Sequence, residues 1–347
     1  MKKVRIGMVG MGQRTCFHGG IIFSGCKKDV EIVAVCDNRK DRLEYGVKAY
    51  SDEFKCKVKG YLDYKEMFQK EELDGVFIAT PNYIHKDIAV AALEKGIDVL
   101  CEKPMELSLK KCDEMTKAAN KAKKILAFGM QMHYRARYHK VKELVQKGAI
   151  GKIAQVWCTE YRGPYGEMKD WVWDKKLSGG AIFEKNCHHY DLLNWWVDSM
   201  PTTVYASGNI LKHKKPYGIK SEIIDNAWVI NDYENGARAM LGINFLADPR
   251  KEHYREFGLI GTEGKIFFSW ADGEIIHVEY NSLHKEHYEM IQNQWIRGGL
   301  EQDFVNCIRS GKQPLITSDA AKNSLLVPMA AELSMDEKRI VHVNELK

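Results

Sequence analysis

The first 130 residues alternate between two patterns, and this alternation constrains the fold more than any other feature of the chain. Short apolar runs rich in β-branched residues occur at residues 4–9, 30–36, 75–79, 98–101 and 125–128. Continuous apolar runs of this kind are typical of strands buried on both faces of a parallel sheet. Between them lie charged segments with helical spacing, and helices are predicted over about 84–95 and 108–124. The alternation predicts an α/β domain with a doubly wound parallel sheet, of the Rossmann type, over residues 1–128.

The pattern changes after Gly129. Strands are predicted over 153–161, 204–210, 227–233, 237–245 and 255–260, and helices over about 137–147, 187–197, 300–309 and 325–334. Strands that follow one another without intervening helices indicate a mostly antiparallel sheet. We therefore predict an α+β domain with a large, mostly antiparallel open sheet over residues 129–347. Because no flexible linker separates the domains, we expect the active site between them.

Composition excludes several classes of protein. The 347 residues carry a formal net charge of +5, and the basic residues form no run of five or six like charges. This argues against nucleic-acid and membrane-surface partners. No window approaches about 18 consecutive apolar residues, so no membrane span is expected. The nine cysteines include no Cys-x-x-Cys pair, which predicts reduced thiols and a cytoplasmic protein.

The first predicted strand runs into a glycine turn, Gly10-Met11-Gly12-Gln13-Arg14-Thr15. Gly10 allows the tight turn, and Gly12 lets the backbone approach a pyrophosphate that free N–H groups at the start of a helix would bind. Thr15 replaces the third glycine of this dinucleotide-binding fingerprint. Asp37 ends the second strand, where a carboxylate can bind both ribose hydroxyls and repel a 2′-phosphate. This favours NAD over NADP, although Arg39 could receive a 2′-phosphate.

Three further segments follow later strands or turns. They are Thr80-Pro81-Asn82-Tyr83-Ile84-His85, then Glu102-Lys103-Pro104, and, after Gly179-Gly180, Glu184-Lys185-Asn186-Cys187-His188-His189-Tyr190-Asp191. Together with the glycine turn they resemble, nearly end to end, the Gfo/Idh/MocA family of sugar and cyclitol dehydrogenases. The resemblance implies that Lys103 is catalytic and that His188 is the general acid/base. Glu184 stands where the family signature has Asp, and Asn186 where it has Gly, which suggests a divergent subgroup.

The chemistry of these residues agrees with the resemblance. Alcohol oxidation needs a base for the hydroxyl proton, a cation for the developing alkoxide and an acceptor for the hydride. His188 can be the base, Lys103 can stabilise the oxyanion, and Glu184 would orient Lys103. If the segment is helical, Glu184, His188 and Asp191 share one face, and Asp191 would bind substrate or fix His188.

The remaining site predictions fall into two sets. Residues expected to bind the cofactor are Gly10, Gly12, Gln13, Arg14, Asp37, Arg39, Thr80, Pro81, Asn82, His85, Glu102 and Lys103. Residues expected to bind the substrate are Lys103, Gln131, His133, Tyr161, Arg162, Trp173, His188, His189 and Asp191. For His189 a structural role is the stronger alternative, and the aromatic residues suit packing as well as a sugar face. No metal site is predicted, because adjacent residues such as Cys187, His188 and His189 point about 100° apart on a helix.

These observations lead to one main hypothesis and two alternatives. The main hypothesis is an oxidoreductase that transfers a hydride between NAD(H) and a secondary hydroxyl or ketone of a sugar, glycoside or cyclitol. The first alternative is an NAD-retaining glycosidase or lyase that acts on glycosides through a transient keto intermediate. The second is a non-catalytic protein that senses the nucleotide. The resemblance also implies a homodimer or homotetramer built on the open sheet.

Overall fold

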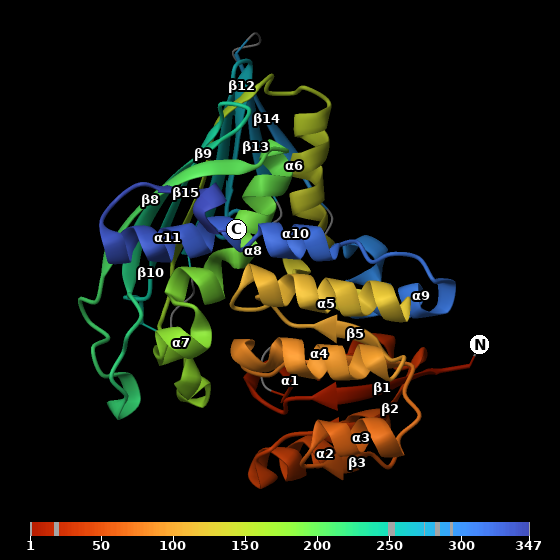
Figure 1. The fold of residues 1–347 in the computed structure, drawn as a ribbon. Coiled ribbons are helices and arrows are strands. Elements are labelled where there is room, and N and C mark those ends of the chain that lie inside the picture. The colour runs from red at the N-terminus through yellow and green to blue at the C-terminus, as the bar shows by residue number, and fades with distance from the viewer. Residues whose placement is uncertain are drawn as a thin grey trace. The chain divides into compact units, whose positions relative to one another are not determined.

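The computed structural model describes residues 2–16, 21–248, 254–273, 275–281, 285–291 and 294–346 (Figure 1). These residues form two compact units, Met1–Gln131 with Arg297–Lys322, and Met132–Ile296 with Asn323–Lys347. The strand and helix pattern placed residues 297–322 in the second domain, whereas the structure groups them with the first unit. The reason is that helix α9, Leu300–Ser310, packs on strand β1, and Arg309 Nη1 lies 2.6 Å from Asp29 Oδ1.

The first unit is built on a six-stranded parallel sheet with the order β3-β2-β1-β4-β5-β6. Its strands are β1 Val4–Val9, β2 Val30–Cys36, β3 Lys59–Tyr61, β4 Gly75–Ile78, β5 Asp98–Cys101 and β6 Leu126–Phe128. This order confirms the doubly wound fold. Strand β3 is short and mostly exposed, so it gave no apolar signal in the sequence. The strand order reverses between β1 and β4, and sheets of this kind bind ligands at the carboxyl ends of the strands flanking such a point.

Helices of the first unit connect these strands. They are α1 Gln13–Cys16, α2 Lys40–Phe54, α3 Tyr64–Lys70, α4 His85–Glu94, α5 Leu109–Ala122, α9 and α10 Ser318–Asn323, with the 3-10 segments η1 Ser24–Cys26 and η2 Asn82–Ile84. Ser108 caps the start of α5, because its Oγ accepts a hydrogen bond of 3.2 Å from Lys111 N. Helices α4 and α5 lie side by side (Figure 1).

The second unit is built on a nine-stranded sheet with the order β14-β13-β12-β11-β7-β10-β9-β8-β15 among the described residues. Its strands are β7 Ile153–Tyr161, β8 Pro201–Asn209, β9 Asn226–Tyr233, β10 Arg238–Asn244, β11 Tyr254–Gly261, β12 Gly264–Ser269, β13 Ile275–Tyr280, β14 Lys285–Met290 and β15 Val341–His342. The neighbours β7 and β10 are parallel, and the other pairs are antiparallel. The predicted mostly antiparallel sheet is confirmed, and strands β12 to β15 add to those predicted.

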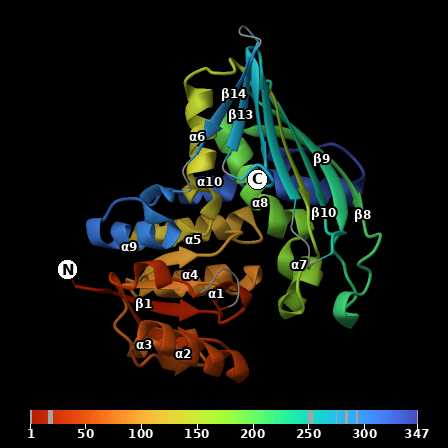
Figure 2. The same cartoon turned by 180° about the vertical axis from the view of Figure 1, so that it is seen from behind.

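Helices pack on this sheet. They are α6 Ala136–Gln146, α7 Lys175–Ser178, α8 Ala181–Val197 and α11 Leu326–Glu337. Helix α8 contacts β7, and α11 contacts β8. Figure 2 shows β8, β9 and β10 running side by side. In β9 the side chains alternate, with Val229 buried and its neighbours Trp228 and Ile230 about half exposed.

Helix α8 begins at Ala181 rather than near Cys187, where the sequence pattern placed its start. Nearly all of its first turns are buried, including charged and polar side chains, so no amphipathic pattern marked this part as helix. Among the described residues, no helix is long and apolar enough to cross a membrane.

Candidate active site

The glycine turn has the geometry that its sequence predicts. Gly10 has a φ of 95°, and a Cβ atom there would lie 2.4 Å from the carbonyl oxygen of Ala79, so only glycine fits. No atom lies within 4 Å of the place where a Cβ of Gly12 would be, which leaves that side of the turn open to a ligand. Thr15 Oγ1 donates a hydrogen bond of 2.8 Å to Gly10 O. Thr15 therefore ties the turn to α1, which carries Gln13 and Arg14.

Asp37, at the end of β2, is held by main-chain amides. Its Oδ2 accepts a hydrogen bond of 2.8 Å from Met11 N, and its Oδ1 accepts one of 2.9 Å from Arg39 N. Each oxygen keeps acceptor capacity for a hydroxyl group. The guanidinium of Arg39 lies on Asp41, with Nη2 2.7 Å from Oδ2. These positions fit a dinucleotide ribose with two free hydroxyls, because Arg39 already has an anionic partner.

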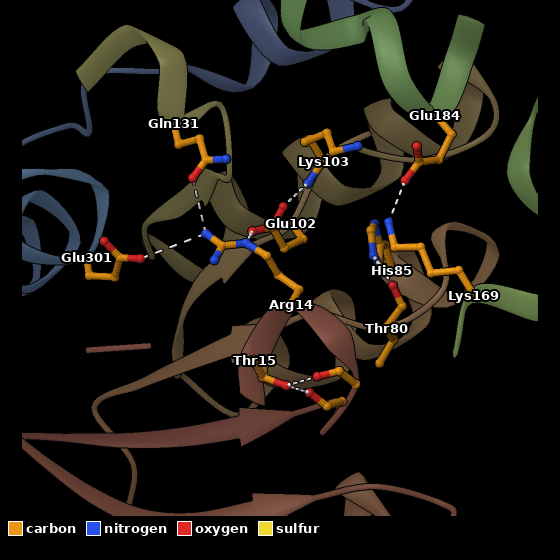
Figure 3. A network of polar contacts seen from close by, with 12 residues as sticks. Arg14, Thr15, Thr80, His85, Glu102, Lys103, Gln131, Lys169, Glu184 and Glu301 are labelled. Carbon is orange, nitrogen blue, oxygen red and sulfur yellow. Dashed lines mark hydrogen bonds and ion pairs between the residues drawn. The ribbon is translucent and has the colours of Figure 1, made fainter. Parts of the chain in front are cut away.

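Arg14 joins a group of polar side chains next to Lys103 (Figure 3). Its Nε lies 2.6 Å from Glu102 Oε1, and its Nη2 lies 3.9 Å from Glu301 Oε1. Arg14 Nη2 also donates a long hydrogen bond, 3.5 Å, to Gln131. Burial acts to lower the pKa of Arg14, but the charge of Glu102 outweighs it and the pKa is raised. The second oxygen of Glu102 accepts a hydrogen bond of 3.1 Å from Lys103 N, so this ion pair fixes the main chain at Lys103.

The imidazole ring of His85 contacts the main chain of two loops. Its Nδ1 lies 3.0 Å from Pro104 O and its Nε2 lies 3.0 Å from Thr80 O, and the side chain is fully buried. Burial lowers the pKa of His85, while the two carbonyl groups oppose that shift. The contacts of His85 are thus with the protein main chain, and its place among the cofactor-binding residues stays a prediction. His85 connects the loop after β4 to the loop after β5, and Asn82 is also buried, with 2% exposure. Thr80 and Pro81 remain partly exposed at the end of β4.

One face of α8 carries the three signature residues of the second unit. Glu184, His188 and Asp191 are all buried on this helix. Lys169 Nζ lies 3.0 Å from Glu184 Oε1 (Figure 3). Asp191 Oδ2 lies 2.8 Å from His133 Nε2. The carboxylate of Asp191 thus contacts His133, a different histidine from His188, which it was predicted to fix.

A second group of charges lies between α8 and the sheet. Glu160 on β7 is fully buried, with Arg255 Nη2 at 2.6 Å and Lys185 Nζ at 3.4 Å. Burial acts to raise the pKa of Glu160, but the charges of Lys185 and Arg255 outweigh it and hold the pKa well below its ordinary value. Glu160 is therefore a fixed anion. Its role could not be predicted from the sequence, because a lone Glu in a strand forms no motif.

Two predicted substrate-binding residues belong instead to the interior. His189 has no exposed surface, and its Nδ1 lies 3.0 Å from Asn186 Nδ2. Trp173 is 1% exposed and packs edge-on against Tyr165, with ring centroids 5.8 Å apart. Their burial favours the packing role that the sequence left open for both, and their contact with substrate stays a prediction. Tyr161, by contrast, is 45% exposed at the end of β7.

The start of α8 rests on a residue from the last helix. Gly180 has a φ of 103°, and a Cβ there would lie 2.2 Å from Glu332 Oε1. That oxygen accepts a hydrogen bond of 3.2 Å from Ile182 N, and Lys175 Nζ lies 3.2 Å from the other oxygen. Burial raises the pKa of Glu332 to about 7 despite the attraction of Lys175. The close approach of this carboxyl group thus explains Gly180, whereas a Cβ at Gly179 would lie 2.4 Å from Cδ1 of Phe183.

The comparisons with known proteins agree with this geometry. The family model described as "Oxidoreductase family, NAD-binding Rossmann fold" matches residues 4–130, and that of the "GFO/IDH/MocA C-terminal domain" matches residues 138–267. The chain belongs to the Gfo/Idh/MocA oxidoreductase family. Among the described residues of this family member, no group of three or more His, Cys, Asp or Glu side chains is placed to hold a metal ion.

Relatives of this Gfo/Idh/MocA protein match it along most of its length. Myo-inositol 2-dehydrogenase from Thermotoga maritima is 26% identical, and the match covers 99% of each chain. The scyllo-inositol 2-dehydrogenase (NAD(+)) from Bacillus subtilis is 26% identical over 95% of this chain and 93% of that protein. Among solved structures, the WlbA dehydrogenase from Bordetella pertussis in complex with NADH and UDP-GlcNAcA has a TM-score of 0.80 at 21% identity, covering 98% of this chain and 99% of that one.

Proposed function

We propose that this oxidoreductase transfers a hydride between NAD(H) and a secondary hydroxyl or ketone of a sugar or cyclitol. The observation that carries the proposal is the buried acid and histidine on one face of α8, Glu184 and His188, in a chain whose other unit has an open glycine turn with Asp37 held beside it. The inositol dehydrogenases among the relatives support the class of substrate.

The proposed division of roles follows from the chemistry of each group. When bound, NAD supplies the hydride acceptor. His188 takes the hydroxyl proton, and the ammonium group of Lys103 stabilises the developing alkoxide. The Arg14–Glu102 pair holds the Lys103 main chain, because Glu102 accepts the Lys103 amide. Glu184, which is ion-paired with Lys169, hydrogen-bonds a neighbouring hydroxyl of the substrate.

The residues of the first unit fit NAD better than NADP. The carboxylate of Asp37 would lie against the adenosine ribose, and it would repel a 2′-phosphate. Arg39, the residue that could offset this repulsion, is paired with Asp41. We therefore propose NAD as the physiological cofactor, bound by the turn Gly10 to Arg14, by Asp37 and by the ends of β4 and β5.

The test begins with protein purified without added cofactor. Bound nucleotide is released with acid and identified by mass, and the protein is then assayed for NADH formation with a panel of sugars, glycosides and inositols. Substrate-dependent NADH formation would support the proposal and identify the substrate. Stoichiometric retained NAD, with a glycoside consumed and no net NADH, would replace it with an internal redox cycle.

We further propose that the open face of the second sheet joins copies of this chain. On that face Tyr205 and Met240 both pair in register with Ile230, and all three are at least 38% exposed. Exposed apolar patches of this kind are typical of subunit interfaces. Replacing Ile230 with Glu should convert the oligomer to monomer in light scattering after size exclusion, without a change in circular dichroism. A wild-type protein that is already monomeric would refute this proposal.

A further inference from the structure

Arg162 is held in place without a carboxylate partner. It follows β7 and is partly exposed. Its Nε donates a hydrogen bond of 3.0 Å to Gly163 O, and its Cζ lies 5.3 Å and 5.5 Å from the ring centroids of Tyr165 and Phe245. It forms no ion pair with any residue in the described parts of the chain. Two aromatic rings therefore orient a guanidinium that has no carboxylate within ion-pair distance among the described residues, which is the arrangement of a preorganised anion receptor.

The surroundings of Arg162 are already positive. Two residues earlier on the same face of β7 lies Glu160, with Arg255 at 2.6 Å and Lys185 at 3.4 Å. One carboxylate thus lies among three cations. The charge of Arg162 also contributes, with those of Lys185 and Arg255, to the lowered pKa of Glu160. Glu160 carries one negative charge beside the three positive charges of Arg162, Arg255 and Lys185.

Contacts within the second unit connect Arg162 to Glu184, the residue that we propose to hydrogen-bond the substrate. The ring of Tyr165 lies near Arg162 and also near Lys169, whose Nζ is 5.6 Å from the ring centroid. Lys169 Nζ is in turn 3.0 Å from Glu184 Oε1. Lys185 follows Glu184 directly on α8. Lys169 therefore joins the ring that orients Arg162 to the residue that we propose to contact the reacting sugar.

We infer that the substrate carries an anionic group, a carboxylate or a phosphate, and that the guanidinium of Arg162 binds it. A guanidinium presents two parallel N–H groups that match a carboxylate or phosphate edge. A neutral sugar needs hydrogen-bond donors and acceptors but no excess of positive charge. The inference rests on the proposed function, because it assumes that the substrate lies beside Glu184. It narrows the substrate class to sugar acids or sugar phosphates.

The test compares matched pairs of compounds that differ in charge. NADH formation is measured with uronates, aldonates and hexose 6-phosphates, each beside its neutral parent sugar. We expect kcat/KM for the best anionic compound to exceed that of its neutral parent by at least about tenfold. Carboxylates and phosphates are assayed separately, so the result also identifies which anion is bound. A neutral sugar as the best substrate would overturn the inference.

Two variants assign the preference to a residue. Arg162→Gln should raise KM for the anionic substrate by about 30-fold or more, with kcat and NAD affinity changed less than about threefold. The control is Arg238→Gln, because Arg238 is a 65% exposed arginine of the same unit, on β10, paired with Asp232. Arg238→Gln should leave KM for the anionic substrate, kcat and NAD affinity unchanged. An equal loss on charged and neutral compounds in Arg162→Gln would indicate a structural role and overturn the inference.

A separate readout distinguishes this inference from the proposed function. If no compound yields NADH, binding of the same compounds to NADH-loaded protein is measured by titration calorimetry. An anionic compound that binds, and binds at least about tenfold more weakly to Arg162→Gln, would support the anion site while the proposed reaction fails. Absence of binding by every anionic compound would overturn the anion site.

Discussion

The glycine turn and the face of α8 hold their carboxylates in different ways. Asp37 accepts hydrogen bonds from the main-chain amides of Met11 and Arg39. Glu184 and Asp191 are instead contacted by side chains, Lys169 and His133. A main-chain donor persists when the sequence changes, whereas a side-chain partner can be replaced by a single mutation. The first unit is therefore suited to one constant ligand, and the second to a substrate site that can diverge.

The largest expected effect comes from removing the cation that follows β5. Lys103→Met should reduce kcat/KM by about 1,000-fold or more, about 4 kcal/mol of transition-state stabilisation. NAD affinity should stay within a few-fold, because the main-chain bond from residue 103 to Glu102 persists. Steady-state kinetics and NADH fluorescence titration measure the two quantities. Normal turnover by this variant would refute the assignment of Lys103.

A pair of glycine variants separates the two regions directly. Gly10→Ala places a Cβ 2.4 Å from Ala79 O and should weaken NAD binding by about 100-fold. Gly180→Ala places one 2.2 Å from Glu332 Oε1, and it should lower the free energy of unfolding by about 2 kcal/mol while leaving NAD affinity unchanged. Titration calorimetry and thermal unfolding distinguish the two effects. If both variants lose NAD affinity alike, the two regions are not independent.

The carboxyl group of Glu332 should make stability depend on pH. Burial raises its folded-state pKa to about 7, above the ordinary 4.5, with Lys175 and Asp336 the charged groups nearest to it. The folded protein thus holds the proton more tightly than the unfolded chain. The contribution of the Glu332 carboxyl group to the free energy of unfolding is therefore fully present below pH 4.5. It is lost as the pH rises through about 7, a decrease of about 3 kcal/mol at most.

Glu332→Gln isolates this contribution. The stability of the wild type relative to Glu332→Gln should decrease between pH 4.5 and 7, as measured by urea unfolding at several pH values. Asp336→Asn is the matched control, because Asp336 also pairs with Lys175 but its side chain is 60% exposed. Parallel pH profiles for the wild type and Glu332→Gln would show that the carboxyl group titrates normally.

The smallest effect is expected at Arg39. Arg39→Ala should change KM for NAD less than about threefold, because the guanidinium lies on Asp41 and only the main-chain amide contacts Asp37. NADP should remain a poor cofactor. A large loss of NADP activity in this variant, measured beside the wild type, would instead show that Arg39 receives a 2′-phosphate.

The two regions also differ in how much the sequence could predict. The turn at Gly10, the strands around it and Asp37 were predicted because they depend on local spacing and on apolar runs of fixed length. The sequence could not reveal that His85 bonds to two carbonyl groups, or that Lys169 pairs with Glu184, since these contacts join separate loops. Glu160 and Glu332 lie on a strand and a helix far from any motif, and only the packing of α8 makes them important.

The chain path has a consequence for synthesis on the ribosome. Helix α9 belongs to the first unit, where Phe304 and Ile308 lie against Gly75, and the carboxyl group at the start of α8 comes from residue 332. When residue 131 has been made, the first unit still lacks a helix that covers its central strands, and α8 lacks its support until the last helix emerges. Neither unit can therefore complete its packing until residues beyond 300 have been synthesised.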